Sequence, residues 1–148
     1  MKLIIKTIAI FFFALSTVTN ANENYFNKAK ELFDKGKIEE SKFLFQRSIV
    51  FNPKHSKSYL YLAKIYKVEE NESEEIKNLN TTLLLEPDNE EATYLLIEIE
   101  LKRSNFSEVK NLRNNLKEIC SLWCEKISSI NERLDDIESK NESWWDQK

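Results

Sequence analysis

Residues 45–53 read Phe-Gln-Arg-Ser-Ile-Val-Phe-Asn-Pro, and the proline that ends this stretch, Pro53, has a counterpart in Pro87. The interval between the two prolines also relates further pairs upstream, which are Tyr25 and Tyr59, Phe26 and Leu60, Ala29 and Ala63, and Phe45 and Leu79. A period of about 34 residues that contains two helical patterns is typical of helix-turn-helix repeat arrays. The chain is therefore predicted to be an all-α solenoid.

Each period contains two apolar stripes at the spacing of a helix face. In the first unit the earlier stripe ends at Gly36, which adopts a left-handed conformation at low cost. The later stripe ends at Pro53, because proline cannot continue the helical hydrogen-bond ladder. We expect three helix pairs, over about 22–53, 54–87 and 88–121.

The stretch Gly36-Lys37-Ile38-Glu39-Glu40-Ser41, together with residues 45–53, resembles the tetratricopeptide repeat (TPR) family in its turn glycine, acidic pair, aromatic residue and closing proline. The resemblance covers about Asn22 to Ser121. Its third unit departs from the pattern, because Arg113 stands where Phe45 and Leu79 stand, and Ser121 replaces the proline. The resemblance implies a TPR-type solenoid of three repeats, in which stacking supplies the core that one helix pair lacks.

A heptad stripe follows the third unit. Its members are Leu116, Cys120, Trp123, Ile127, Ile130, Leu134 and Ile137. The stripe predicts either one long helix or a separate helix over 122–140 that caps the last repeat. The alternative is a seam for a homodimer. Residues 141–148 are predicted to be a flexible tail.

Residues 1–21 have the pattern of a secretory signal peptide. Lys2 and Lys6 precede an apolar run from Thr7 to Val18, and small residues lead to a cleavage position after Ala21. The run is shorter than the roughly 20 residues that span a bilayer. We expect export, most simply to the periplasm of a Gram-negative bacterium. If the signal is not cleaved, it would tether the chain to the membrane.

The two cysteines, Cys120 and Cys124, form a C-x-x-x-C pattern. This pattern lacks the two-residue spacing of a redox-active pair and the following histidine of a haem attachment site. In an exported chain the pair is a candidate disulfide, which is easier to form if the helix breaks at Ser121. Two free thiols and a thiol-active pair are the alternatives.

The composition argues against several functional classes. A formal net charge of −3 does not favour nucleic-acid binding, which needs a basic surface. The only histidine, His55, lies far from both cysteines in the sequence, so no metal site is expected. No nucleophile–base arrangement or paired acid is recognisable, and we therefore expect no enzyme activity and no cofactor.

The resemblance implies that the first helix of each pair lines a concave groove. The residues expected to point into it recur at the interval of the repeat, and within each helix they share one face. They are Phe26, Lys30, Phe33, Leu60, Lys64, Lys67, Tyr94, Glu98 and Leu101. Such a groove suits a peptide held by one or two aromatic contacts. The alternative is that Phe26 and Phe33 pack against the next repeat.

These features predict a non-catalytic scaffold or assembly factor of the cell envelope whose partner is another protein or peptide. Some TPR proteins grip a C-terminal carboxylate with basic and amide side chains. The corresponding positions here include Phe26, Leu60, Glu91 and Leu95, which do not favour that subtype. Lys64 and Lys67 would still attract an acidic peptide. A self-associating structural protein and a thiol-active factor are the competing hypotheses.

Overall fold

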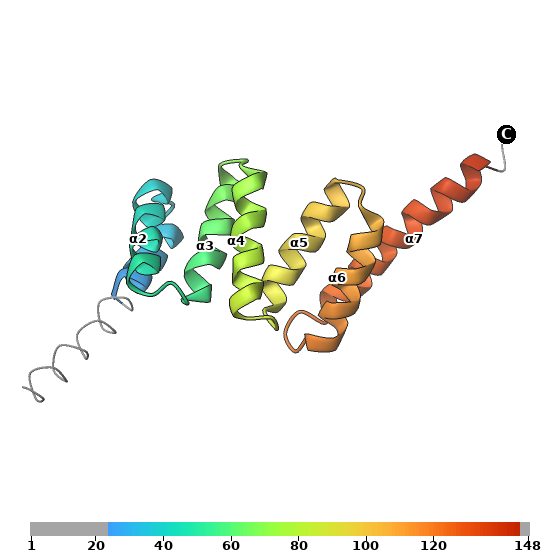
Figure 1. The fold of residues 1–148 in the computed structure, drawn as a ribbon. Coiled ribbons are helices and arrows are strands. Elements are labelled where there is room, and N and C mark those ends of the chain that lie inside the picture. Colours follow the sequence, from blue (N-terminus) through green and yellow to red (C-terminus); the bar gives the residue numbers. More distant parts are fainter. Residues whose placement is uncertain (1–23, 146–148) are drawn as a thin grey trace, which may run out of the picture. The chain divides into compact units, whose positions relative to one another are not determined.

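The computed structural model describes the backbone of residues 24–145 and the side chains of residues 24–137. A helical segment over residues 24–34 comes first, and no strand occurs in this described part of the chain. The helices that follow it are α2 (Ile38–Phe51), α3 (Ser56–Val68), α4 (Glu72–Leu85), α5 (Glu90–Lys102), α6 (Phe106–Ile119) and α7 (Glu125–Trp145) (Figure 1). The all-α prediction is confirmed. The predicted signal peptide lies outside the described residues.

The turn inside each helix pair has the same backbone geometry. Gly36, Glu70 and Ser104 occupy equivalent positions of the three repeats, and their φ angles are 73°, 56° and 58°. In all three turns the amide of the next residue donates to a carbonyl five residues earlier, at 2.9 Å. This is the bond that defines the Schellman motif at a helix C-terminus. The third unit therefore keeps the repeat's turn although its sequence departs from the pattern.

The chain divides into two compact units, one up to Leu85 and the other from Glu86. In the first unit, helix 24–34, α2 and α3 share one apolar core. Its buried members are Phe26, Ala29, Phe45, Leu62 and Ile65. Ala29 and Ala63 are fully buried, as expected where a small side chain permits close helix packing.

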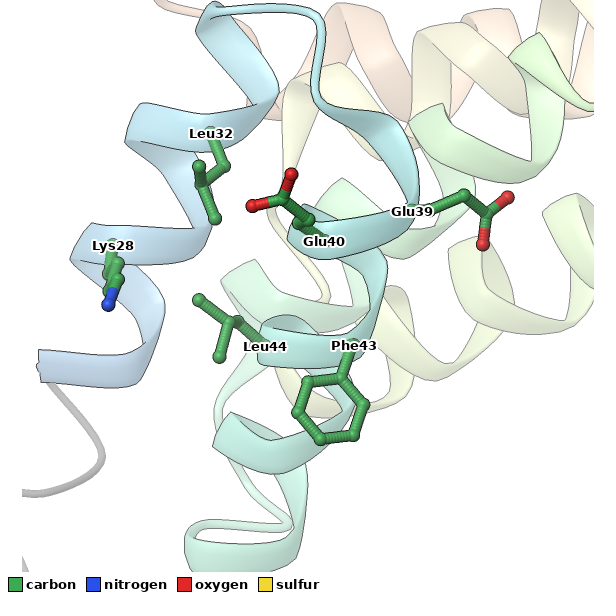
Figure 2. Close-up of a pocket in the computed structure, with 6 residues that line it drawn as sticks. All are labelled: Lys28, Leu32, Glu39, Glu40, Phe43 and Leu44. Atoms are coloured by element: carbon green, nitrogen blue, oxygen red, sulfur yellow. The ribbon is translucent and has the colours of Figure 1, made fainter.

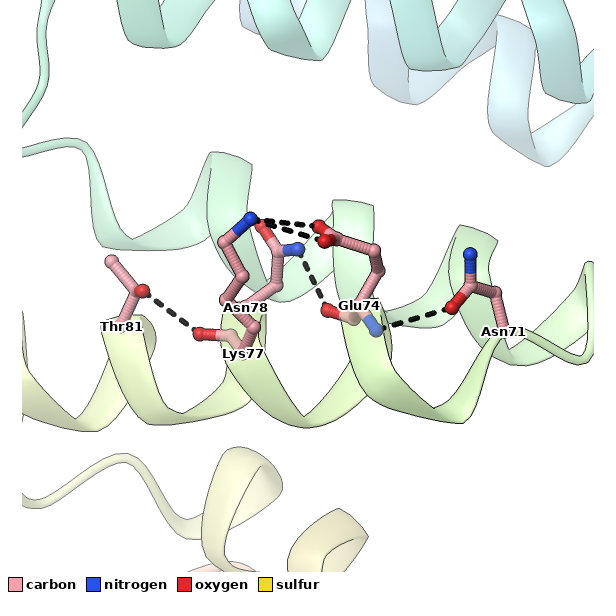
Figure 3. A network of polar contacts seen from close by, with 5 residues as sticks. All are labelled: Asn71, Glu74, Lys77, Asn78 and Thr81. Carbon is pink, nitrogen blue, oxygen red and sulfur yellow. Dashed lines mark hydrogen bonds and ion pairs between the residues drawn. The ribbon is translucent and has the colours of Figure 1, made fainter.

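Polar groups of α4 are satisfied largely along the helix itself (Figure 3). The Asn71 side-chain oxygen accepts from the amide of Glu74 at 3.2 Å. This bond caps the N-terminus of the helix. The Asn78 and Thr81 side chains donate to carbonyls one turn earlier, each at 2.8 Å. The Lys77 ammonium pairs with the Glu74 carboxylate at 3.1 Å.

In the second unit α5, α6 and α7 enclose a core of Ile97, Leu101, Val109, Leu116, Ile130 and Leu134. α6 ends at Ile119, Cys120 is extended, and α7 is a separate helix. Up to Leu134 the residues of the heptad stripe are therefore either buried in this core or half-buried against it, as expected of a helix that caps the last repeat. Arg113, the departure from the repeat, donates to the Asn131 side chain of α7 at 2.8 Å.

The cap differs in its limits from the predicted 122–140. It begins at Glu125 and continues to Trp145, so the first five residues of the expected tail are helical. The sequence contains no glycine or proline after Pro87. α7 therefore contains neither glycine nor proline, the two residues that most readily interrupt a helix.

Among the described residues, no helix has the length and apolar character needed to cross a membrane.

Candidate functional site

The first unit does not offer Phe26 and Leu60 as free apolar contacts for a ligand. Phe26 is only 7% exposed, and its ring contacts those of Phe45 and Tyr61 at centroid distances of 5.6 and 5.7 Å. Leu60 is also buried. The prediction that these two side chains line a groove is corrected, because the core of the helix pair needs them. Packing of Phe26 against the next repeat, the alternative considered above, is what the structure shows.

Five other side chains on helix 24–34 and α3 are basic or aromatic and are exposed or half-buried. Phe33 and Tyr61 are half-buried and meet edge to face at 5.4 Å. The Lys64 ammonium lies 4.6 Å from the centre of the Tyr61 ring. This is a cation–π contact. Lys30 and Lys67 are exposed one helical turn from Phe33 and Lys64. We call these five residues the lysine–tyrosine surface.

Tyr61 is the member of this surface that sequence reasoning missed. It lies beside the repeat position of Leu60, and its counterpart in the third unit, Leu95, carries no ring. In the sequence, the three-residue interval between Tyr61 and Lys64 already indicated that the two side chains share one face of a helix. The ring is held in place by stacking on Phe45 at 5.0 Å, so its orientation is fixed before any ligand binds.

In the second unit the expected groove residues face the chain's own C-terminal segment. The Tyr94 ring contacts Trp123 at 5.1 Å, and Glu98 pairs with Arg133 of α7. Burial, with help from Glu98, raises the pKa of Tyr94. Leu101 belongs to the core. Tyr94 and Glu98 are therefore half-buried against this segment and Leu101 lies in the core, so the structure does not present the three as one open row.

A carboxylate clamp holds the loop between α6 and α7. Glu90, in the first turn of α5, accepts hydrogen bonds from the backbone amides of Ser121, Leu122 and Trp123 at 2.7–2.9 Å, and from the Ser121 hydroxyl at 2.7 Å. Desolvation would raise the pKa of Glu90, but these four donors outweigh it and lower the pKa to about 2. Sequence reasoning did not identify this residue.

Cys120 and Cys124 are joined by a disulfide across the same loop. The loop lies between the end of α6 and the start of α7, and a helix break at Ser121 was expected to make the bridge easier to form. The bridge and the clamp therefore act on one short segment. Within the described residues no cluster of three or more histidine, cysteine or acidic side chains could hold a metal ion.

No protein-family model and no curated protein sequence matches this chain. Solved structures do match it. The type III secretion chaperone SycD of Yersinia enterocolitica, in complex with a peptide of the translocator YopD, is 16% identical, with a TM-score of 0.69 over 80% of this chain and 93% of that one. The first TPR of Spaghetti (RPAP3), bound to the HSP90 peptide SRMEEVD, is 13% identical, with a TM-score of 0.70 over 80% and 94%.

A third match is the TPR domain of P58(IPK), which is 16% identical, with a TM-score of 0.74 over 84% of this chain and 35% of that one. At these identities the likeness concerns the fold. The three matches share a helical-repeat architecture with the chain, and the predicted TPR-type solenoid is confirmed.

Proposed function

We propose, from the premise that this chain has the tetratricopeptide repeat fold, that it is a non-catalytic scaffold that binds a peptide segment of a partner protein. Two of the matched structures hold peptides, and one of those peptides, SRMEEVD, contains three acidic residues. The observation that carries the proposal for this chain is the lysine–tyrosine surface. It offers the Lys64 ammonium over the half-buried Tyr61 ring, the half-buried ring of Phe33, and two exposed lysines, Lys30 and Lys67, on the same two helices.

This surface favours an acidic peptide with an apolar side chain. Lys30, Lys64 and Lys67 would attract carboxylates, and an exposed charge of this kind acts mainly on the association rate and is weakened by salt. Phe33 and Tyr61 would supply the apolar contact, since aromatic residues carry much of the binding energy at such interfaces. Because both rings are already packed, little conformational freedom is lost on binding.

The test uses two fluorescein-labelled peptides of equal length that each contain one Leu and one Phe, and differ in carrying four Glu or four Lys. We expect fluorescence anisotropy to show tighter binding of the acidic peptide, with an affinity that falls as salt is raised. The double variant Lys64→Glu/Lys67→Glu should lose this binding. Lys54→Glu, a charge reversal at an exposed position of the same unit, is the matched control. Equal affinity for the two peptides would contradict the proposal.

We further propose that the chain is an exported envelope protein whose residues 1–21 are removed. The basic start and apolar run support this proposal, and so does the Cys120–Cys124 bridge, because disulfides persist in oxidising compartments. After expression of the full chain in a Gram-negative host, intact mass of the periplasmic fraction should give an N-terminus at Asn22. Recovery with Met1 in the membrane fraction would indicate an uncleaved anchor, and recovery in the cytoplasm would contradict export.

A further inference from the structure

A cleft of about 450 Å³ lies between helix 24–34 and α2, formed by residues that the lysine–tyrosine surface does not use (Figure 2). Its lining consists of Lys28, Leu32, Glu39, Glu40, Phe43 and Leu44. All six come from these two helices. Among the described residues, none from another helix lines the cleft.

Three apolar side chains, Leu32, Phe43 and Leu44, line the cleft, and one of them, Leu44, also packs against the core of the unit. Phe26, Ala29 and Phe45 occupy the core-facing stripes of the same two helices. Leu32 and Leu44 point into the space between the helices and are half-buried (Figure 2). The Phe43 side chain is 56% exposed at the side of this space. Exposed aromatic surface next to an apolar depression is characteristic of interaction sites.

Charges of opposite sign lie at the two ends of the cleft. The Glu40 side chain points toward Leu32 at one end of the cleft, whereas the Glu39 side chain, at the same end of α2, points away from helix 24–34 (Figure 2). Glu40 also forms an exposed ion pair with Lys37 at 3.6 Å. Lys28 lies on helix 24–34 one turn before Leu32, on the side of the cleft toward which Leu44 points (Figure 2). Arg47, one turn beyond Phe43, adds a second positive group, its guanidinium carbon 5.7 Å from the centre of the Phe43 ring. A ligand with the reverse order of charges would be complementary to both ends.

We propose that this cleft docks an amphipathic segment of a partner protein that carries a bulky apolar side chain between a basic residue and an acidic residue. The apolar side chain enters between Leu32 and Leu44 and contacts Phe43. The basic residue faces Glu40, with Glu39 adding to the negative charge of that end, and the acidic residue faces Lys28 and Arg47. The volume lies within the range of ligand-binding clefts and accommodates one or two large side chains.

The fixed direction of the charges gives this site a stronger specificity than apolar contact alone. A segment presented in the reverse direction would place like charges opposite each other at both ends, which disfavours binding. The site uses none of the lysine–tyrosine residues. The result of a test of this cleft is therefore independent of whether the lysine–tyrosine surface binds a peptide.

The test is selection of displayed random dodecapeptides on the full chain, followed by anisotropy measurements with the enriched peptides. We expect the enriched sequences to place an aromatic residue or Leu between a Lys or Arg and an Asp or Glu. Phe43→Ala should weaken binding roughly tenfold, because it removes the main exposed contact. Val50→Ala is the matched control, since Val50 lies on the same helix, is 77% exposed and does not line the cleft.

Charge reversal provides the sharper measurement. When the selection is repeated on Glu39→Lys/Glu40→Lys, the enriched peptides should replace their basic residue with Asp or Glu. Gln46→Lys, an added charge at an exposed position of α2 outside the lining, should leave the selected pattern unchanged. Helical circular dichroism of each variant checks that the fold is retained.

Four outcomes would overturn the proposal. The first is that no pattern is enriched, or that the pattern survives the charge reversal. The second is that the enriched peptides no longer bind the Lys64→Glu/Lys67→Glu variant, which would place their binding site on the lysine–tyrosine surface. The third is stronger binding only after residues 1–21 are deleted, which would make that segment the occupant. The fourth is self-association that Phe43→Ala abolishes, which would make a second copy the occupant.

Discussion

The three turns of the repeat place their left-handed residue at equivalent positions, but only the first unit has a glycine there. Glu70 and Ser104 adopt φ angles of 56° and 58° at the positions that correspond to Gly36. A residue with a Cβ atom has a conformational cost in this region that glycine avoids. The second and third turns are therefore formed against the preference of their own residues, and the flanking helices hold them in place.

We predict that Glu70→Gly and Ser104→Gly each stabilise the protein by about 1 kcal/mol, since each removes the left-handed penalty. Chemical denaturation monitored by circular dichroism measures the change. Gly36→Ala is the converse variant, and it should destabilise by a similar amount. A Cβ at Gly36 would meet no heavy atom within 4 Å, so the backbone conformation alone causes the loss. Destabilisation by either glycine substitution would argue against this explanation.

Two serines of α2 differ in how their buried hydroxyls are satisfied. The Ser48 hydroxyl accepts a hydrogen bond from Ser58 at 2.9 Å, whereas the Ser41 hydroxyl has no hydrogen-bond partner among the described residues. We predict that Ser41→Ala stabilises the protein by about 1 kcal/mol, because it removes a desolvated group that gains nothing on folding. Ser48→Ala, which removes a buried hydroxyl that is hydrogen-bonded to Ser58, should have the opposite sign. Equal effects of the two variants in urea unfolding would refute the distinction.

At the scale of elements, Glu90 connects the first turn of α5 to the loop between α6 and α7. Its pKa is depressed to about 2 from an ordinary value of 4.5, so the folded state favours the ionised carboxylate. The stabilisation is fully present above pH 4.5 and is lost as the pH falls toward 2. Acid should therefore weaken the attachment of the loop before α6 or α7 loses its own helical hydrogen bonds.

We predict that Glu90→Gln lowers the Tm at pH 7 and shows a smaller fall in Tm between pH 4.5 and pH 2.5 than the natural protein. The amide retains an acceptor atom but not the charge that the four donors stabilise. Because other carboxylates also titrate in this range, the difference between the two proteins is the informative quantity. Glu118→Gln, at an exposed position of α6, is the control. Parallel Tm profiles for Glu90→Gln and the natural protein would exclude the clamp.

The sequence predicted helix boundaries more reliably than the accessible face of each helix. Gly36 and Pro53 terminate helices through local backbone chemistry, which is independent of distant contacts. The exposure of Phe26 depends instead on Tyr61, and that of Tyr94 depends on Trp123. The repeat period identified equivalent positions, but it did not show which of them a neighbouring helix would cover. In the sequence, Glu90 could not be distinguished from other acidic residues in the first turn of a helix, because its partners are backbone amides of a distant loop.

At the scale of the whole molecule, the chain forms two compact units with separate apolar cores. All three tryptophans of the sequence lie after Glu86, and Trp123 packs against the core of the second unit, so a change in the fluorescence of Trp123 reports on that unit, whereas circular dichroism reports on helices of both units. Phe45 is fully buried in the first core and Leu134 is buried in the second. Substitution of either residue removes contacts from one core only. The two optical probes can therefore show whether the repeats unfold together.

We predict that Phe45→Ala adds an early transition to the thermal unfolding curve measured by circular dichroism and leaves the midpoint of tryptophan fluorescence nearly unchanged. The lost ring costs the first unit about 3–5 kcal/mol, while the second core keeps its contacts. Leu134→Ala should shift the fluorescence midpoint, because Leu→Ala in a core costs about 2–5 kcal/mol. In a repeat array stability depends on each unit and its nearest neighbours, so such a separation is expected when each core is self-contained. If Phe45→Ala moved both probes by the same number of degrees, the two units would unfold as one.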